Sequence, residues 1–201
     1  MPECLKRVEA VKEFRLKSTR TSTVKLAETP RKFQTENMPT GNYIVIPKVS
    51  SEKRFYVPMG FMDFENLIGD ACFIIPDVSL YHFGILTSGI HMAWMRAVAG
   101  RLETRYRYSK DIVYNNFPWP SVNEKRKSKI ESAAKKILEV REKFPESSLA
   151  DLYDPLTMPE ELLKAHKAND AAVCEAYGWP KDINEEKIIA ELFRLYENFT
   201  M

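Results

Sequence analysis

The run RLETRYRY at residues 101–108 holds the side chains of this chain that are best suited to chemistry. Aromatic and β-branched residues without Gly or Pro predict a β-strand. Side chains alternate between the two faces of a strand, so Arg101, Glu103, Arg105 and Arg107 are expected to share one face. Arg suits the edges of guanine, and Glu can accept from the amino group of cytosine. The pattern favours either a base-contacting face or a solvated edge strand whose charges neutralise one another.

A second group of polar side chains could bind phosphates. The segment 18–32 is rich in Ser and Thr and carries four cations, Arg20, Lys25, Arg31 and Lys32. Such groups position a protein on DNA without contacting bases. The alternative interpretation of this segment is a solvated loop.

The charges of the chain are distributed unevenly between its first and second parts. Residues 1–120 carry 17 Lys and Arg against 12 Asp and Glu, whereas residues 121–201 carry 13 against 16. A basic first part joined to an acidic second part indicates that only the first faces a polyanion.

Composition places the chain among ordinary soluble globular proteins. The three cysteines, Cys4, Cys72 and Cys174, form neither a CxxC pair nor a disulfide pattern, which predicts a reducing setting. The first residues lack the apolar core of a signal peptide, and no run approaches the roughly 20 apolar residues of a membrane span. We therefore expect a cytoplasmic protein without a membrane partner.

The first 120 residues predict short strands and helices around the charged strand. Apolar spacing predicts helices, and proline-bounded runs of β-branched and aromatic residues predict strands. The expected order is a helix over 5–17, an irregular segment over 18–40, strands over 43–46, 54–57 and 71–75, a helix over 80–99 with a possible break at Gly89, the strand over 101–108, and a returning strand over 111–117.

Beyond Pro120 the pattern is helical only. Three capping-box patterns begin at Ser121, Thr157 and Asp182, and each precedes a helix. The sequence therefore predicts an α+β protein with two domains, a mixed α/β domain with short strands over 1–120 and a small all-helical domain over 121–201.

Catalytic signatures are missing from the sequence. It has no glycine-rich phosphate loop, no nucleophile elbow and no HExxH or paired Cys/His metal motif. His82 and His91 are interpreted as packing or locally hydrogen-bonded residues, His166 as a surface residue, and Asp63 and Glu65 as solvated or capping residues. We expect no catalytic, cofactor-binding or metal-binding residue in this chain.

Several strings together resemble one known family. They are YHFGILTS at 81–88, HMAWMR at 91–96, GRL at 100–102, YRYS at 106–109, VYNNFPWP at 113–120, LYDPLTMP at 152–159 and LLKAH at 162–166. Their order and spacing are similar to the C-terminal part of MmeI-like type IIL (IIG) restriction–modification enzymes, over nearly the whole chain.

The resemblance implies a particular division of labour. Enzymes of this family are long chains with a nuclease domain, a helical linker, an S-adenosylmethionine-dependent adenine-N6 methyltransferase, a target-recognition domain and a helical end. The chain resembles only the last two, so it is expected to supply DNA specificity without catalysing alone. The implied partners are double-stranded DNA and the methyltransferase domain of the same polypeptide. No cofactor is expected in this chain, while the parent would use S-adenosylmethionine, and Mg²⁺ where the nuclease is present.

The resemblance also implies individual roles. In the family, base contacts come from the positions that match Glu103, Arg105 and Arg107, and a Glu-x-Arg pair is associated with a C·G base pair in one orientation, with Lys-x-Asp for the reverse. The position matching Ala71 acts together with that of Arg107. Arg101 is better suited to a phosphate or to capping the preceding helix, and Lys110 is a further candidate for phosphate contact.

Two other functions remain open at this point. One is a self-contained methyltransferase that uses Asn115 and Asn116, which the missing cofactor motif disfavours. The other is a protein-interaction adaptor that docks a partner through its acidic, amphipathic C-terminal helices.

Overall fold

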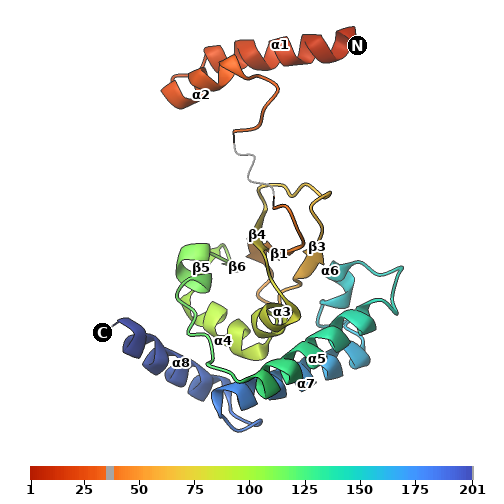
Figure 1. Ribbon diagram of the computed structural model, residues 1–201, viewed down its shortest axis with the longest axis vertical. Helices are drawn as coiled ribbons and strands as arrows, with labels where there is room; N and C mark the ends of the chain where they lie inside the picture. The colour runs from red at the N-terminus through yellow and green to blue at the C-terminus, as the bar shows by residue number, and fades with distance from the viewer. Residues whose placement is uncertain (35–38, 201) are drawn as a thin grey trace. The chain divides into compact units, whose positions relative to one another are not determined.

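The computed structural model describes residues 1–34 and 39–200, and it divides into two compact units, Met1–Met38 and Pro39–Met201. Figure 1 shows the elements of each unit. The expected irregular segment over 18–40 extends partly outside the described residues. Among the described residues, no helix is both long enough and apolar enough to cross a membrane.

The first unit is a small helical hairpin. It consists of α1 (Pro2–Leu16), α2 (Thr21–Lys25) and the 3₁₀ turn η1 (Leu26–Glu28). The Arg15 guanidinium donates to the carbonyls of Leu26, Thr29 and Lys32 at 2.8, 3.0 and 2.9 Å. This one side chain therefore holds residues 26–32 against α1. The first helix is as predicted, but the irregular segment was predicted wrongly for residues 21–28.

The second unit contains two three-stranded antiparallel sheets. In one, β1 (Tyr43–Pro47) lies between β3 (Gly60–Met62) and β4 (Cys72–Pro76). In the other, β6 (Arg105–Arg107) lies between β2 (Val49–Ser50) and β5 (Gly100–Leu102). Because only Lys48 separates β1 from β2, one stretch of chain takes part in both sheets.

Of the three strands expected between residues 43 and 75, two are confirmed and one is wrong. The strands predicted over 43–46 and 71–75 match β1 and β4 within one residue. Residues 54–57 form a loop instead. Tyr56 and Val57 in this loop are buried, and the Tyr56 hydroxyl donates to Asp170 at 2.7 Å. Their apolar character therefore reflects packing against helices rather than a place in a sheet.

The expected strand over 101–108 is in fact a hairpin. β5 and β6 pair through Leu102 and Arg105, which leaves Glu103 and Thr104 as a two-residue turn. Glu103 has a φ of 57°, in the left-handed region, whereas Thr104 keeps a negative φ. An uninterrupted strand needs extended backbone at every residue, so the left-handed Glu103 ends it.

The returning strand predicted over 111–117 is also wrong. Residues 110–114 form the π-helix η2 (Lys110–Tyr114), whose start is capped by the Ser109 side chain. Both edges of β6 are already taken by β2 and β5, so no edge remains for this segment. The Val113 carbonyl instead accepts from the Trp94 indole at 3.0 Å.

The helices of the second unit follow the predicted pattern closely. The expected helix over 80–99 is interrupted before Gly89 into α3 (Leu80–Leu86) and α4 (Gly89–Val98). The C-terminal part has α5 (Glu124–Arg141), a short α6 (Leu149–Leu152), α7 (Glu160–Tyr177) and α8 (Glu185–Thr200). Asn123 and Asn184 provide side-chain caps, whereas Pro159 precedes α7 without one. The α+β class is confirmed.

One hydrophobic core joins the residues on both sides of Pro120. It runs from Ile44 in β1 to Leu192 in α8. Gly84 permits the closest approach, because a Cβ at this position of α3 would lie 2.6 Å from Cγ2 of Ile130 in α5. The C-terminal helices therefore complete the core under the sheets.

His166 is a buried residue, contrary to the surface position expected for it. Its Nε2 lies 2.7 Å from the Tyr153 hydroxyl, and its ring stacks on Tyr56 with centroids 4.2 Å apart. The polar neighbours in the sequence lie on the outer face of α7, while position 166 faces the core. His82 accepts a local hydrogen bond from the Ser79 N–H and His91 is packed in the core, both within the expected packing or local roles.

Candidate nucleic-acid interface

The β5–β6 hairpin presents an exposed ion pair at its turn. The Arg105 guanidinium donates to Oε2 of Glu103 at 2.7 Å, with the side chains 45% and 75% exposed. Ion pairs at such exposure contribute little to stability. The pair does, however, hold a donor fork and a carboxylate side by side before any ligand arrives.

The hairpin changes which charged side chains share a face. Arg105 and Arg107 are two residues apart on β6 and point the same way, while Tyr106 between them is buried on the other side. Arg101 pairs directly with Tyr106, so these two side chains share the second face. The expected common face is therefore retained for Arg105 and Arg107 and is wrong for Arg101.

Arg101 braces the hairpin in this structure. Its guanidinium lies 3.8 Å from the centroid of the Tyr106 ring and donates to the Thr104 carbonyl at 3.0 Å. A cation over an aromatic face is attractive, and the second contact ties the turn back to β5. The side chain thus restrains the turn that carries Glu103.

Ala71 and Arg107 approach the same short stretch of chain from its two sides. The Lys48 backbone N–H donates to the Ala71 carbonyl at 2.9 Å, and the Lys48 carbonyl accepts from the Tyr108 N–H at 2.8 Å. Val49, next to Lys48, pairs with Arg107. The two positions, 36 residues apart in sequence, are thereby joined through Lys48.

Lys48 is a candidate that the sequence interpretation missed. Its ammonium lies 5.0 Å from the centroid of the Phe73 ring, beside the start of β4. The signal available in the sequence was a lone cation directly after Pro47, between two apolar strand segments. The signal identifies Lys48 as a candidate only when the two strand segments on either side of it are known.

Buried side chains support the hairpin from below. Tyr108 follows β6, and its hydroxyl lies 2.9 Å from Nε2 of His91 in α4. Burial lowers the pKa of His91 to about 3, so the imidazole is neutral near pH 7. Burial also raises the pKa of Tyr108, so its phenol keeps its proton. The contact is therefore a neutral hydrogen bond inside the core.

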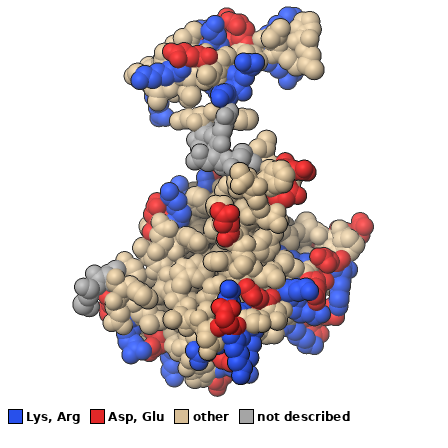
Figure 2. Space-filling view, in the orientation of Figure 1, with Lys and Arg blue, Asp and Glu red and all other residues tan. Residues whose placement is uncertain are grey.

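The four cations expected to contact phosphates lie in the first unit, whereas the hairpin belongs to the second. Arg20, Lys25, Arg31 and Lys32 are all exposed. Residues 1–34 carry nine Lys and Arg against four Asp and Glu, and Figure 2 shows these cations spread over the first unit. Lys110 is also exposed, at the start of η2.

Other polar residues have local roles. Asp63 accepts from the Glu65 N–H at 3.1 Å and the Asn66 amide at 2.6 Å, which is the capping role expected for it. Within the described ranges 1–34 and 39–200, no group of three His, Cys, Asp or Glu side chains could hold a metal ion.

Comparison with known proteins gives consistent matches along the chain. Residues 1–121 match the family model described as the MmeI target recognition domain, and residues 122–201 match the MmeI C-terminal domain. The DNA methyltransferase A of Bacillus subtilis (strain 168) is 43% identical over 199 residues, which are 99% of this chain and 22% of that protein.

A solved structure of the type IIL restriction–modification enzyme MmeI in complex with DNA is similar as well. It superposes with a TM-score of 0.94 at 47% identity over 98% of this chain. The match covers 26% of that enzyme, so this chain spans about a quarter of the length of both relatives.

Proposed function

The chain belongs to the MmeI family, and on that premise we propose that it supplies DNA sequence recognition to an adenine-N6 DNA methyltransferase of the type IIL restriction–modification class. Residues 1–120 act as the target-recognition domain and residues 121–201 as the helical domain that supports it. The apolar faces of α5 and α7 lie in the shared core, which favours support over docking of a separate protein partner.

The observation that carries the proposal is the preformed Glu103–Arg105 pair on a two-stranded ribbon. The major groove of B-DNA admits such a ribbon, and each base pair presents a distinct pattern of donors and acceptors there. Arg105 would donate to O6 and N7 of a guanine, while Glu103 would accept from N4 of the paired cytosine. One good bidentate contact gives roughly 1–3 kcal/mol of discrimination.

A second contact is proposed for Arg107 beside Ala71. Side chains two residues apart on a strand are separated by about 7 Å, which is about two base-pair rises of B-DNA. Arg107 would therefore contact a base pair two steps from the one contacted by Arg105. Ala71 leaves room for the base, and Lys48 between them is proposed as an additional contact of this step.

Phosphate contacts are proposed for the exposed cations. Arg20, Lys25, Arg31 and Lys32 of the first unit are exposed and would position DNA without contacting bases. Lys110 is proposed for the same role. Arg101 is the least suited of these cations, because its guanidinium already donates to Thr104 and stacks on Tyr106.

The catalytic functions are assigned to other parts of the polypeptide. We propose that S-adenosylmethionine binds to the methyltransferase domain, that Mg²⁺ is needed only by a nuclease domain where one is present, and that the assembly acts on double-stranded DNA in the cytoplasm. The similarity to a DNA methyltransferase and to an enzyme solved with DNA supports this division.

The test replaces the pair in a complete enzyme. In a chimera, residues 1–201 take the place of the matching segment of the Bacillus subtilis relative, and Glu103→Lys with Arg105→Asp reverses the pair. Sequencing of methylated sites should show the C·G pair replaced by G·C at one position of the site. An unchanged base at every position would contradict the proposed roles.

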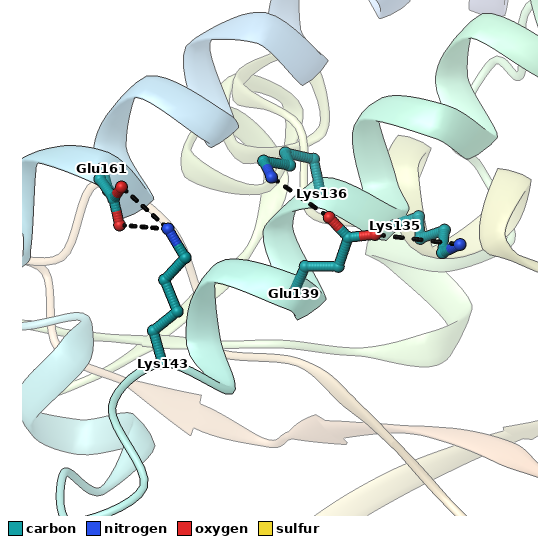
Figure 3. Close-up of polar contacts among 5 residues, drawn as sticks. All are labelled: Lys135, Lys136, Glu139, Lys143 and Glu161. Atoms are coloured by element: carbon teal, nitrogen blue, oxygen red, sulfur yellow. Dashed lines mark hydrogen bonds and ion pairs between the residues drawn. The ribbon is translucent and has the colours of Figure 1, made fainter.

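The matched control is a charge reversal of an exposed ion pair that lies outside the hairpin. Glu161→Lys with Lys143→Glu reverses an exposed pair between α7 and the end of α5, drawn in Figure 3. This double variant should leave the methylated sequence unchanged.

A further inference from the structure

A carboxylate from the C-terminal helices reaches the helix that leads into the hairpin. Asp170 lies on α7, and its Oδ1 accepts from the backbone N–H of Gly89, the first residue of α4, at 2.6 Å. Its Oδ2 accepts from the Tyr56 hydroxyl at 2.7 Å. The Asp170 side chain is only 16% exposed. A single, largely buried carboxylate thus joins α7, α4 and the loop before β3.

The contact provides a hydrogen-bond partner for a backbone N–H at the start of α4 that has none within the helix. The first N–H groups of a helix have no partner within the helix. The Ser88 hydroxyl accepts from the His91 N–H at 3.2 Å, and Asp170 accepts from Gly89. Negative charge at a helix N-terminus is also favourable to the helix dipole. Asp170 therefore completes the start of α4 from a residue 81 positions away.

The fit depends on the absence of a side chain at position 89. A Cβ on Gly89 would lie 3.0 Å from Oδ2 of Asp170 and 3.2 and 3.3 Å from its Cγ and Oδ1. All three atoms belong to a carboxylate that is held on both oxygens, so they have little freedom to retreat. The Asp170 carboxylate therefore fits closely against the first residue of α4.

The other end of α4 is tied to the hairpin. α4 ends at Val98, and β5 begins at Gly100 after Ala99. His91 holds Tyr108, the residue after β6, and Trp94 holds the Val113 carbonyl. Since the middle of α4 is packed in the core, a shift of its first turn would be transmitted to both strands of the hairpin.

We propose that Asp170 is a positioning residue for the β5–β6 hairpin, through its hold on the first turn of α4. Its consequence for DNA discrimination rests on the function proposed above. In this way the C-terminal helices take part in sequence recognition without contacting a base.

A matched control lies on the same helix. Glu161 of α7 accepts from the Lys143 ammonium at 2.9 Å on both oxygens, and both side chains are at least half exposed (Figure 3). This pair joins α7 to the end of α5 and not to α4. Removing it changes the charge of α7 as much as removing Asp170 does.

The first experiment measures amide hydrogen exchange in the whole chain, at equal intervals below each variant's melting temperature. In Asp170→Ala, the amides of β5 and β6 should exchange about tenfold faster than in the wild type, because the Gly89 N–H loses its partner. Asp170→Asn keeps an acceptor oxygen and should restore most of the protection. Glu161→Gln should match the wild type. A lower melting temperature with unchanged exchange in β5 and β6 would overturn the proposal and leave Asp170 a purely structural residue.

The second experiment approaches the contact from the other side. Gly89→Ala crowds the carboxylate and should also accelerate exchange in β5 and β6. In the presence of Asp170→Ala the crowding atoms are gone, so Gly89→Ala should add almost nothing. Strictly additive effects would show that the two residues act separately, which would overturn the proposed route.

The third experiment separates this proposal from the one on which it rests. The chain is titrated with two duplexes that differ only by C·G or G·C at the proposed Glu103–Arg105 step. Asp170→Ala should reduce the wild-type affinity ratio several-fold, and Glu161→Gln should not. A wild-type ratio of one would contradict base recognition by the hairpin, while the exchange data would still decide the positioning role. A clear wild-type ratio that Asp170→Ala leaves unchanged would overturn the positioning role alone.

Discussion

The hairpin and the α5–α7 helix pair use the same kinds of charged residues for opposite purposes. On the hairpin, Glu103 and Arg105 form an ion pair that is largely open to water. Beneath the sheets, Arg141 of α5 donates to the Met59 carbonyl at 2.7 Å and to the Tyr153 hydroxyl at 2.9 Å. The Glu103–Arg105 pair is available to a ligand, whereas the Arg141 guanidinium is committed to contacts within the fold.

This difference suggests why a recognition module can change its specificity without losing its fold. Exposed side chains on a short ribbon contribute little to stability, so they can be exchanged. The α5 and α7 helices contribute fully buried side chains such as Ile130 and buried polar groups such as His166 and Asn169, whose loss leaves cavities or unpaired atoms.

The largest effect is expected for the helical support. Ile130→Ala removes a fully buried side chain that lies against Gly84 where α5 and α3 come close together. The substitution should lower the free energy of unfolding by about 2–5 kcal/mol. Arg107→Ala on the hairpin should change it by about 0.5 kcal/mol or less. Urea unfolding of both variants measures the two losses of stability. Equal shifts of the two unfolding midpoints would contradict the proposed contrast between support and hairpin.

The next effect concerns the two buried histidines. Burial lowers the pKa of His91 and of His166 to about 3, from an ordinary value of 6.5. Below pH 6.5 the unfolded chain takes up protons that the folded chain does not, so stability is full above this pH and falls as the pH decreases towards 3. Each imidazole contributes a slope of up to about 1.4 kcal/mol per pH unit.

Urea unfolding at pH 6 and pH 5 gives the free energy of unfolding at each pH. Between these two values it should decrease less in His91→Gln than in the wild type. His82→Gln is the control, since His82 is only partly buried. The same slope in the wild type and His91→Gln would mean that His91 is protonated in the folded chain.

A smaller effect of opposite sign is expected at the hairpin turn. Glu103 occupies left-handed backbone, which Gly adopts more readily. Glu103→Gly should therefore leave stability unchanged or raise it by up to about 1 kcal/mol, while base discrimination by the hairpin is lost. Paired urea and duplex-binding measurements check both halves. A clear loss of stability would show that the exposed ion pair matters more than the backbone.

The smallest effect is expected at the surface of the helical support. Glu161→Gln breaks the Lys143 pair at two exposed side chains, although the pair lowers the pKa of Glu161. Its melting temperature should equal that of the wild type within error, because water replaces exposed ion-pair contacts well. A decrease comparable to that of Ile130→Ala would remove the distinction between exposed and buried positions within the support itself.

Several features of the molecule were determined by local sequence signals. Apolar periodicity predicted the five long helical segments and the β1 and β4 strands, because burial of one face imposes the spacing directly. The break at Gly89 was expected from the glycine itself, and helices begin at positions 124, 160 and 185, close to the three expected capping boxes. The caps differ from the expected ones, because Asn123 and Asn184 provide them in place of Ser121 and Asp182, and α7 has no side-chain cap. The α+β class follows from these elements.

The sequence motifs also placed the candidate contacts on a single short segment. Glu103, Arg105 and Arg107 were singled out from residue types and spacing, together with the family resemblance. Which side chains are present at a position is local information, so the sequence alone can show it.

The arrangement of those side chains depends instead on contacts between elements that lie far apart in the chain. The hairpin turn at Glu103 depends on β2 and β5 occupying the two edges of β6, and Arg101 moves to the Tyr106 face as a result. The position of Lys48 between Ala71 and Tyr108, the burial of His166 and the hold of Asp170 on Gly89 each join residues far apart in the chain. Such contacts are set by the packing of whole elements against one core, and no local pattern of residues encodes which partner each will meet.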